Sequence, residues 1–384
     1  MKTTDNSDRS AIIVWDLPTR VFHWLLVVGF ALALITSDDS RYLYAHVYGG
    51  YLFAGLLAFR FIWGAVGSRY AKFRSFAYDW PSVTAYLKGL INGQASRYIG
   101  HNPAGSWAIF AMLLLGLLVV ITGLVVLGGE ERHGPLNGLI SFKVGKGTKE
   151  IHELLAWSMF GLVVLHLCGV ILESVFHKEN LIWAMITGRK EAAAGTPGAA
   201  GHHLLGVTLL FVGAASALSY FHGYLVETAD SPYRPFRGPQ LPDNAVWREA
   251  CGECHLAYHP NLLPARSWQL MMDEQAEHFG DDLGLDEETV KEVTDFLVKN
   301  AAEAGMTEAA WEMMESIGPD EKPLSIVETK YWKHEHKEIS DAYWKSEKVR
   351  AKGNCAACHL DAKEGTFEDS SMRLPDLSKS ERKP

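Results

Sequence analysis

Two short runs of the sequence combine residues that can hold a cofactor covalently. Residues 251–255 read CGECH and residues 355–359 read CAACH, so each run has the pattern Cys-x-x-Cys-His. In this pattern two thiols form thioether bonds to a c-type haem, and the histidine becomes an axial ligand of its iron. The runs therefore predict two covalent haems c, attached through Cys251, Cys254, Cys355 and Cys358, with His255 and His359 as proximal ligands.

A Cys-x-x-Cys pair also occurs in zinc sites and in thiol redox centres. Both runs end in the histidine that haem attachment needs, and both lie in one acidic region, which favours haem. They use four of the five cysteines, and the fifth, Cys168, lies in an apolar segment. We therefore expect no disulfide in the region that carries the two runs.

A haem c that only carries electrons needs a second axial ligand on its iron. The candidates are His278, at the end of the run SWQLMMDEQAEHF, and His336, 19 residues before Cys355. His259 follows His255 by about one helical turn, which is poor geometry for the same iron but suits a neighbouring haem. Met271 and Met272 are weaker alternatives. The sequence leaves the choice among the three histidines open, because each could also be a surface residue.

Five segments are long and apolar enough to cross a bilayer, which takes about 20 helical residues. They are approximately residues 21–36, 44–64, 106–127, 151–172 and 204–224. With the N-terminus in the cytoplasm, the cytoplasmic connections hold twelve Lys and Arg and the opposite ones hold five. Cytoplasmic loops of membrane proteins normally carry the excess of positive charge, so this count favours that orientation. An odd number of spans then places everything after residue 224 outside, where c-type haems are attached.

Four histidines lie in or at the ends of these segments, namely His23, His46, His152 and His166. An ionisable residue inside a membrane span is costly and is a functional candidate, although some are structural. His152 and His166 are 14 residues apart, so they share one helix face about 21 Å apart along the axis. The topology matches His46 with His152 near the outer surface and His23 with His166 near the inner one. Each pair could hold one haem b.

The charge of the 384-residue chain divides as the spans do. Up to Gly223 there are 17 Lys and Arg against 13 Asp and Glu, and after it 19 against 32. The acidic outer part favours a partner with a basic patch. The sequence has no glycine-rich nucleotide loop, nucleophile motif or nucleic-acid signature, so we expect no catalytic residue of those kinds and no nucleic-acid partner.

The segments VWDLPTRVFHW, HVYGGYLFAGLLAFRFIWG, GHNPAG and IHELLAWSMFGLVVLHL resemble those of the bacterial cytochrome b561 and nickel-hydrogenase b-type cytochrome family, over about residues 11–190. The resemblance implies a four-helix bundle with two haems b that exchanges electrons with quinone. The family's ligand positions fall on His23, His46, His152 and His166.

The segments CGECHLAYHPNLLPARSW, EHFGDD and NCAACHLDAKEGTFED resemble the dihaem cytochrome c family, over about residues 245–384. That resemblance implies low-potential haems, each with two histidine ligands. It supports His278, His336 and His259 equally as distal ligands. The fifth span departs from the four-helix pattern of the b-type cytochrome family. The resemblance therefore does not establish that the partner is a hydrogenase.

We therefore expect an all-α protein in five parts. They are a membrane dihaem cytochrome b bundle (1–190), a cytoplasmic linker (191–203), a fifth transmembrane helix (204–224), a Pro-rich periplasmic linker (225–244) and a mainly helical periplasmic dihaem cytochrome c domain (245–384). The chain would be an iron-containing, multi-pass protein of the bacterial inner membrane and its respiratory chain. A homo-oligomer stays open.

The predicted function is electron transfer from quinol through two haems b to two haems c and on to a periplasmic acceptor. It would be a quinol:cytochrome c-type oxidoreductase or a simple carrier. The alternatives are reverse flow from a hydrogenase-like donor to quinone, a haem reductase or oxidase of a small molecule, and a redox sensor. Candidate quinone contacts are His101, Asn102 and the Arg69–Arg74 loop on the inner side, and His133 and Lys143 on the outer side.

Overall fold

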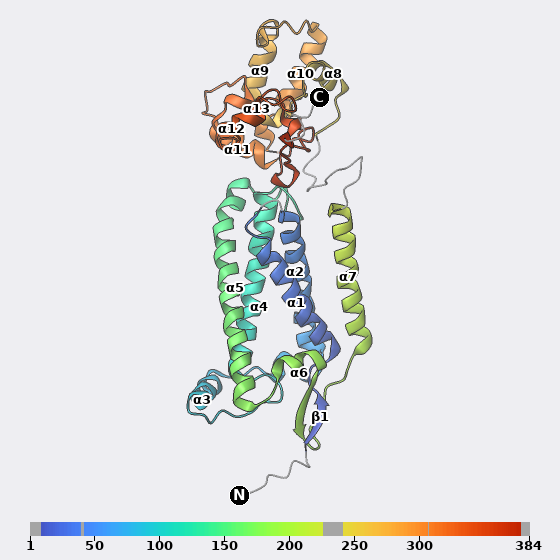
Figure 1. Cartoon of the computed structure of the whole chain (residues 1–384), viewed down its shortest axis with the longest axis vertical. Helices are drawn as coiled ribbons and strands as arrows, with labels where there is room; N and C mark the ends of the chain where they lie inside the picture. The colour runs from blue at the N-terminus through green and yellow to red at the C-terminus, as the bar shows by residue number, and fades with distance from the viewer. Residues whose placement is uncertain (1–8, 40–41, 226–240, 306, 378–384) are drawn as a thin grey trace. The chain divides into compact units, whose positions relative to one another are not determined.

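The computed structural model describes residues 9–39, 42–225, 241–305 and 307–377. It is mainly helical, and five helices are long and apolar enough to cross a membrane. They are α1 (Leu17–Ile35), α2 (Leu43–Val66), α4 (Pro103–Gly129), α5 (Phe142–His177) and α7 (His203–Leu225) (Figure 1). Each overlaps one predicted span. The predicted fold class, a helical membrane bundle with a fifth span, is confirmed.

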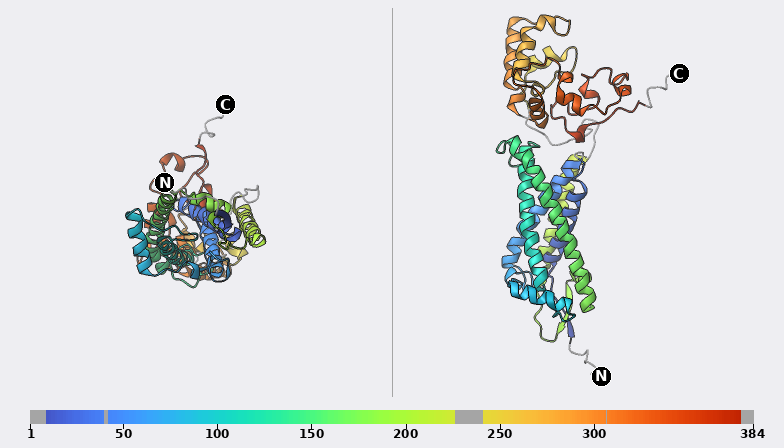
Figure 2. Two further views of the ribbon diagram at one scale, coloured as in Figure 1. Left: turned by 90° about the horizontal axis from the view of Figure 1, so that it is seen from below. Right: turned by 90° about the vertical axis from the view of Figure 1, so that its left-hand side faces the viewer.

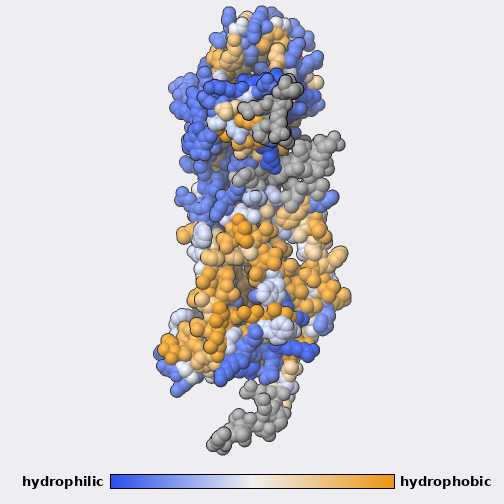
Figure 3. Space-filling view, viewed as in Figure 1, coloured by the Kyte–Doolittle hydropathy of each residue, from blue (hydrophilic) through white to orange (hydrophobic). Residues whose placement is uncertain are grey.

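The surface of the long helices is mostly apolar (Figure 3). Leu114 on α4, Leu154 on α5 and Phe211 on α7 are all exposed. An apolar surface of this extent is unfavourable in water and normal in lipid. Helix α5 has 36 residues, more than a bilayer requires, because the helix continues beyond its apolar part into a first turn that carries Lys143 and Lys146.

The described residues form two compact units. The first lies within Met1–Asp38, Ala45–Gly123 and Thr148–His222, and the second within Asp39–Tyr44, Leu124–Gly147 and Gly223–Pro384. Of the predicted Pro-rich linker, 225–244, residues 226–240 lie outside the described part of the chain.

Asp16 fixes the start of α1 in the first unit. Its side chain accepts a hydrogen bond from the Thr19 amide at 3.1 Å, as a helix N-cap does. The other carboxylate oxygen accepts from the indole N–H of Trp63 at 3.1 Å, and Asp16 is fully buried. One carboxylate therefore both caps α1 and ties it to α2.

Helix α7 packs on α1 and α2 within the same unit (Figures 1 and 2). The Tyr48 hydroxyl lies 3.0 Å from that of Ser216, and the Tyr48 and Tyr220 ring centroids are 5.0 Å apart. A Cβ at position 206 would lie 2.4 Å from Leu17, so this close approach requires glycine. The fifth span is an integral helix of the first unit.

A two-stranded ribbon, which the sequence did not predict, joins distant parts of the first unit. Strand β1 (Arg9–Ile13) pairs antiparallel with β2 (Arg189–Ala193), with Ile13 opposite Arg189. Beyond β2, the Ala199 amide donates to the Ile13 carbonyl at 2.6 Å. Much of the segment predicted as a cytoplasmic linker is therefore held against the start of the chain by backbone hydrogen bonds.

Two short helices complete the first unit. Helix α3 (Trp80–Ile91) is capped by Asp79, and α6 (Leu181–Thr187) is capped by Asn180. Gly188 ends α6 at φ +80°, and a Cβ there would lie 2.4 Å from the Trp15 carbonyl. Its own carbonyl accepts from the Val14 amide at 2.8 Å, so this glycine brings α6 against the start of α1.

The second unit is built from short helices. They are α8 (Ala245–Gly252), α9 (Ala265–Asp273), α10 (Glu287–Lys299), α11 (Glu308–Ser316), α12 (Lys330–Glu335) and α13 (Asp341–Trp344), with short 3-10 turns between them. Their core contains Trp247, Leu263, Trp268, Val293 and Leu297. The helices bury little area individually, so this shared core and the loops around it must position the cofactor residues.

Candidate functional site

The first Cys-x-x-Cys-His run begins at the end of α8. Asn244 caps this helix by accepting from the Trp247 amide at 2.7 Å, and Trp247 is buried in the core. The second run begins in a 3-10 turn, Cys355–Ala357. Burial raises the pKa of the Cys251 and Cys355 thiols to about 11. A thiol-exchange centre needs the opposite shift, so this environment speaks against that alternative.

Each proximal histidine of these runs faces one distal candidate. The ring centroids of His255 and His278 are 6.2 Å apart, and those of His336 and His359 are 6.0 Å apart. An imidazole nitrogen binds a metal at roughly 2 Å, which puts two rings on opposite sides of one metal with centroids about 6 Å apart. Both separations fit an iron held between two histidines.

The membrane histidines come together in the predicted pairs. His46 on α2 and His152 on α5 have ring centroids 6.1 Å apart, the same separation as in the other two pairs. His23 on α1 lies close enough to His166 on α5 for their charges to interact. A Cβ at Gly123 of α4 would lie 3.0 Å from the His152 ring, so a glycine there leaves room for that ring.

Hydrogen bonds fix the tautomer of four of these eight histidines. In each, Nδ1 faces a backbone carbonyl, and because a carbonyl only accepts, Nδ1 must carry the proton. The pairs are His46 and Ala33 (2.8 Å), His152 and Val119 (3.1 Å), His255 and Leu256 (2.7 Å), and His336 and Trp332 (2.9 Å). Their Nε2 atoms are left free to bind a metal, the arrangement typical of ligating histidines.

The third distal candidate, His259, differs from these histidines in its surroundings and in its tautomer. Its Nδ1 accepts from the Asn261 amide at 3.3 Å, so in the neutral ring Nε2 holds the proton. The residue is 1% exposed, and a Cβ at Gly365 would lie 2.2 Å from its ring, so the backbone passes directly over it. Burial lowers the pKa of His259 to about 4. These contacts favour a structural role for His259 over iron ligation.

Among the described residues, six histidine ring nitrogens are buried without a hydrogen-bond partner, namely Nδ1 of His23, His101, His278 and His359 and Nε2 of His177 and His259. Buried polar atoms are normally paired. These positions can each take a hydrogen bond from or to a bound group or an ordered water. Three of the six belong to the histidines that form facing pairs, one to the third distal candidate His259, one to the candidate quinone contact His101, and one to His177.

His101 lies beside two aromatic rings, with its centroid 4.7 Å from that of Trp15 and 4.4 Å from that of Phe76. Burial lowers the pKa of His101 to about 3, and the cations Arg60 and Lys190 lower it further. The ring is therefore neutral at any ordinary pH. It can donate to a ligand oxygen or accept from one without a charge change.

The other predicted quinone contacts have different surroundings. The side-chain oxygen of Asn102 accepts from the Gly105 amide at 2.7 Å and so caps α4. His133 is buried, with Nε2 3.2 Å from an oxygen of Glu368. Lys143, Arg69 and Arg74 are exposed. Among these predicted contacts, His101 alone has a buried ring nitrogen that lacks a hydrogen-bond partner.

One polar cluster was missed by the sequence analysis. Glu173 of α5 is buried and accepts a hydrogen bond from the Tyr86 hydroxyl of α3. Its other oxygen lies 3.5 Å from His177 Nε2. The signal was a carboxylate seven residues after His166, which the predicted span, ending at residue 172, did not include.

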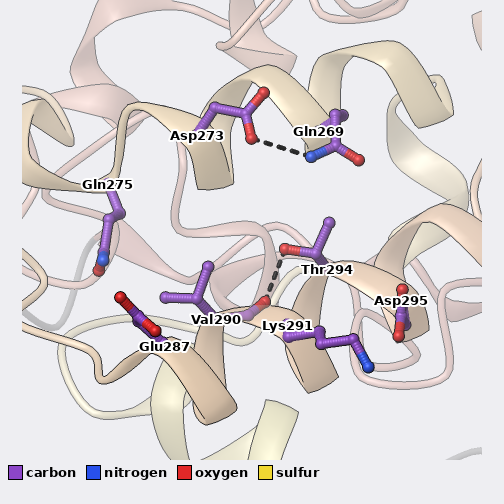
Figure 4. Close-up of a pocket in the computed structure, with 8 residues that line it drawn as sticks. All are labelled: Gln269, Asp273, Gln275, Glu287, Val290, Lys291, Thr294 and Asp295. Carbon is purple, nitrogen blue, oxygen red and sulfur yellow. Dashed lines mark hydrogen bonds between the residues drawn. The ribbon is translucent and has the colours of Figure 1, made fainter.

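A hollow of about 360 Å³ lies between α9 and α10 (Figure 4). Its lining is polar, with Gln269 donating to Asp273 at 2.9 Å and Thr294 donating to the Val290 carbonyl at 2.6 Å. None of the predicted site residues lines it. We assign it no role.

Comparison with protein families gives two separate matches. Residues 14–188 match the model of the family described as prokaryotic cytochrome b561, and residues 247–367 match that of the dihaem cytochrome c family. The first range contains all four membrane histidines, and the second contains both Cys-x-x-Cys-His runs.

Curated relatives match the first half of the chain. A probable Ni/Fe-hydrogenase 1 B-type cytochrome subunit of Escherichia coli K12 is 24% identical over 217 residues, covering 47% of this chain and 92% of the relative. A probable Ni/Fe-hydrogenase B-type cytochrome subunit of Rhizobium leguminosarum bv. viciae is 25% identical, covering 48% of this chain and 90% of the relative.

Solved structures are similar to the second half. A diheme cytochrome c from Rhodobacter sphaeroides is 35% identical and covers 34% of this chain and 100% of its own, with a TM-score of 0.30. A diheme cytochrome type c from Shewanella baltica OS155 is 30% identical and covers 35% of this chain and 94% of its own, with a TM-score of 0.29.

Proposed function

Because residues 14–188 of this chain belong to the prokaryotic cytochrome b561 family and residues 247–367 to the dihaem cytochrome c family, we propose that it oxidises membrane quinol and delivers the electrons to a periplasmic acceptor. Membrane electron transfer follows from the two families together with the five apolar helices. The quinol donor, the outward direction and the periplasmic acceptor are the proposal. Such a protein is a quinol:cytochrome c-type oxidoreductase of the respiratory chain.

The proposal rests mainly on the distance between paired histidine rings, which is nearly the same in three pairs. The ring pairs His46–His152, His255–His278 and His336–His359 have centroids 6.1, 6.2 and 6.0 Å apart. These pairs, with His23 and His166, would hold two haems b and two haems c. When bound, the haems supply one-electron redox chemistry that the axial ligands and burial tune.

The chain's own residues prepare these positions. The backbone carbonyls of Ala33, Val119, Leu256 and Trp332 hold four of the rings in the tautomer that leaves Nε2 free. Two histidines would hold each haem iron, and such a ligand set favours electron transfer over the reduction of a small molecule. The thiols of Cys251, Cys254, Cys355 and Cys358 would attach the two haems c covalently.

We place the quinone at the inner end of the first unit, the end that carries His23 and His166. His101 is half-buried there, with a buried, unpartnered Nδ1 that can hydrogen-bond a quinone oxygen. His133, on the outer side in the predicted topology, already has Glu368 as a partner. Electrons that enter at the inner end would cross toward the pair His46 and His152.

Orientation and partners complete the proposal. The N-terminus lies in the cytoplasm of a bacterial cell, and the region after residue 244 lies in the periplasm as the dihaem cytochrome c domain. That region carries most of the chain's 45 acidic residues, so its acceptor would present a basic patch and bind more weakly at high salt.

The test is a haem-resolved redox titration of the purified protein, with pyridine haemochrome quantification and stopped-flow mixing with a quinol analogue. The expected result is two haems b and two haems c per chain, all low-spin, with haem b reduced before haem c. No reduction by quinol at any haem would remove the proposed donor. A single haem b would break the pairing of the membrane histidines.

The reverse direction is a second candidate, favoured by the names of the relatives, which are hydrogenase subunits. In that case a periplasmic donor would reduce haem c first and quinone last. The same titration separates the two directions. Haem c potentials well below the quinone potential would favour inward flow, and potentials above it would favour outward flow.

A further inference from the structure

The electron-transfer sites leave one buried acid of the first unit without a role. Glu173 is 9% exposed, near the end of α5. It accepts a hydrogen bond from the Tyr86 hydroxyl and lies 3.5 Å from His177 Nε2. A carboxylate inside a membrane helix is costly, and such residues often serve proton or ion pathways.

Its position follows from the helix geometry. Glu173 comes seven residues after His166 on α5, which is close to two full turns. The two side chains therefore point to nearly the same face, with Glu173 about 10 Å further along the axis. Helix α5 ends at His177, so Glu173 lies between the inner histidine pair and the end of the helix.

One buried cation, Lys190, lies near both Glu173 and the proposed quinone contact His101. Lys190 of β2 is buried, donates to the Tyr98 carbonyl at 3.2 Å and lies 3.4 Å from an oxygen of Glu179. It is near enough to interact electrostatically with both Glu173 and His101. The groups facing Glu173 are therefore Tyr86 from α3, His177 from α5 and Lys190 from β2.

We propose that Glu173 is the proton-exchange group of the inner quinone site, and that it moves protons between quinone and the aqueous phase at the end of α5. The proposal rests on the quinone chemistry proposed above. Quinone chemistry also requires a group that accepts and releases protons, and histidines that bind iron cannot serve as that group. The proposal assigns this role to Glu173.

Oxidation of one quinol to quinone breaks two O–H bonds and releases two electrons and two protons. The electrons pass singly to ferric haem, the oxidant. Each proton passes to the Glu173 carboxylate, which becomes a carboxylic acid and then returns the proton to water. In the reverse direction the same group would take up protons for quinone.

The competing explanation is structural, since the Tyr86 hydrogen bond also ties α3 to α5. Two substitutions separate the roles. Glu173→Gln keeps an oxygen that can accept from Tyr86 but cannot carry an exchangeable acidic proton. Tyr86→Phe removes the hydrogen bond and keeps the carboxylate. Glu173→Asp restores a carboxylate in a shorter side chain.

The experiment uses the full chain in lipid vesicles. Haem b reduction by a quinol analogue is followed across pH, proton release is followed with a pH indicator, and infrared difference spectra are recorded between oxidised and reduced protein. We expect E173Q to slow reduction by quinol by on the order of 100-fold and to lose the redox-linked carboxylic acid band. Reduction by dithionite should be unchanged, E173D should recover most of the rate, and Y86F should lose little.

Glu179 is the matched control. It also lies on the inner side, but it pairs with Arg97 at 2.9 Å and with Lys190. E179Q should keep the wild-type rate and the carboxylic acid band. If E173Q matches the wild type in rate, pH profile and infrared band, the assignment is overturned while the proposed function stands.

Two other outcomes are also decisive. If quinol does not reduce the wild type, the proposed function itself fails. If E173Q loses haem b, the less disruptive variants E173D and Y86F show whether the role of Glu173 is structural. An equal loss of haem b in E173D and Y86F would mean that Glu173 only ties α3 to α5, and it would overturn the assignment. An E173D that keeps haem b and recovers most of the rate, beside a normal Y86F, supports it.

Discussion

The sharpest prediction concerns the second distal ligand of the dihaem region. His336 lies with its ring 4.2 Å from Trp332, nearly parallel at 11°, and donates its Nδ1–H to the Trp332 carbonyl. Its centroid lies 6.0 Å from that of His359. Replacing His336 with Ala should remove one axial ligand without disturbing the thioether bonds, so the haem stays attached and its iron becomes high-spin.

The size of the effect follows from the number of sites. The change should convert one of two c-type haems, hence about half of the c-type low-spin signal and about a quarter of the low-spin signal of all four haems. Pyridine haemochrome should still report two haems c. His336→Met should restore a low-spin iron at a raised potential, because a methionine ligand favours the reduced form.

The chain offers a matched control two residues away. His334 is 69% exposed and lies 2.9 Å from a Glu335 oxygen, so H334A should leave the spectrum unchanged. H259A should also keep both haems c low-spin. Electron paramagnetic resonance and magnetic circular dichroism measure the spin states. A low-spin H336A beside a high-spin H259A would refute the argument from ring separation and tautomer.

Three further predictions test other parts of the chain. His152→Ala should lower bound haem b from two to about one per chain and leave haem c unchanged, and loss of both haems b would mean that the sites are not separate. Burial lowers the pKa of His259 to about 4, below the unfolded value of about 6.5. The unfolded state therefore binds the proton first on acidification, and stability should fall by up to about 3 kcal/mol between pH 6.5 and 4. H259Q should lack that part of the pH dependence in unfolding titrations, and an equal slope in both proteins would contradict the assignment. Asp16→Ala should cost about 2–4 kcal/mol, because it removes the cap of α1 and leaves the buried Trp63 indole unpaired. Asp79→Ala removes a similar but exposed cap and should cost about 1 kcal/mol in the same unfolding assay.

The sequence was most informative where chemistry fixes the spacing. Cys-x-x-Cys-His leaves little freedom in the residues that attach a haem, and lipid demands long apolar helices, so both features could be predicted. Residues Arg189–Ala193 have the sequence RKEAA, which shows no strand alternation, and their pairing with Arg9–Ile13 comes from tertiary contact.

The choice among distal histidines needed three dimensions. Spacing along the chain cannot say that His278 faces His255 or that an Asn261 amide donates to His259. Glu173 was missed for a different reason. Hydropathy marks where a helix is apolar and stops at the first charge, whereas α5 continues to His177 and buries that charge against α3.

If His152 and His166 bind haems in the proposed orientation, their spacing on α5 would also make electron transfer sensitive to voltage. About 21 Å along the axis is roughly two thirds of a 30 Å hydrocarbon core. An electron that moves from the inner pair to the outer one crosses that share of the membrane potential, about 1.5 kcal/mol at 100 mV. A cell interior that is electrically negative would therefore shift the equilibrium between the two pairs about tenfold toward the outer one. Energising the membrane should speed outward flow and oppose inward flow, so the direction of transfer depends on the energetic state of the cell as well as on the potentials of the cofactors.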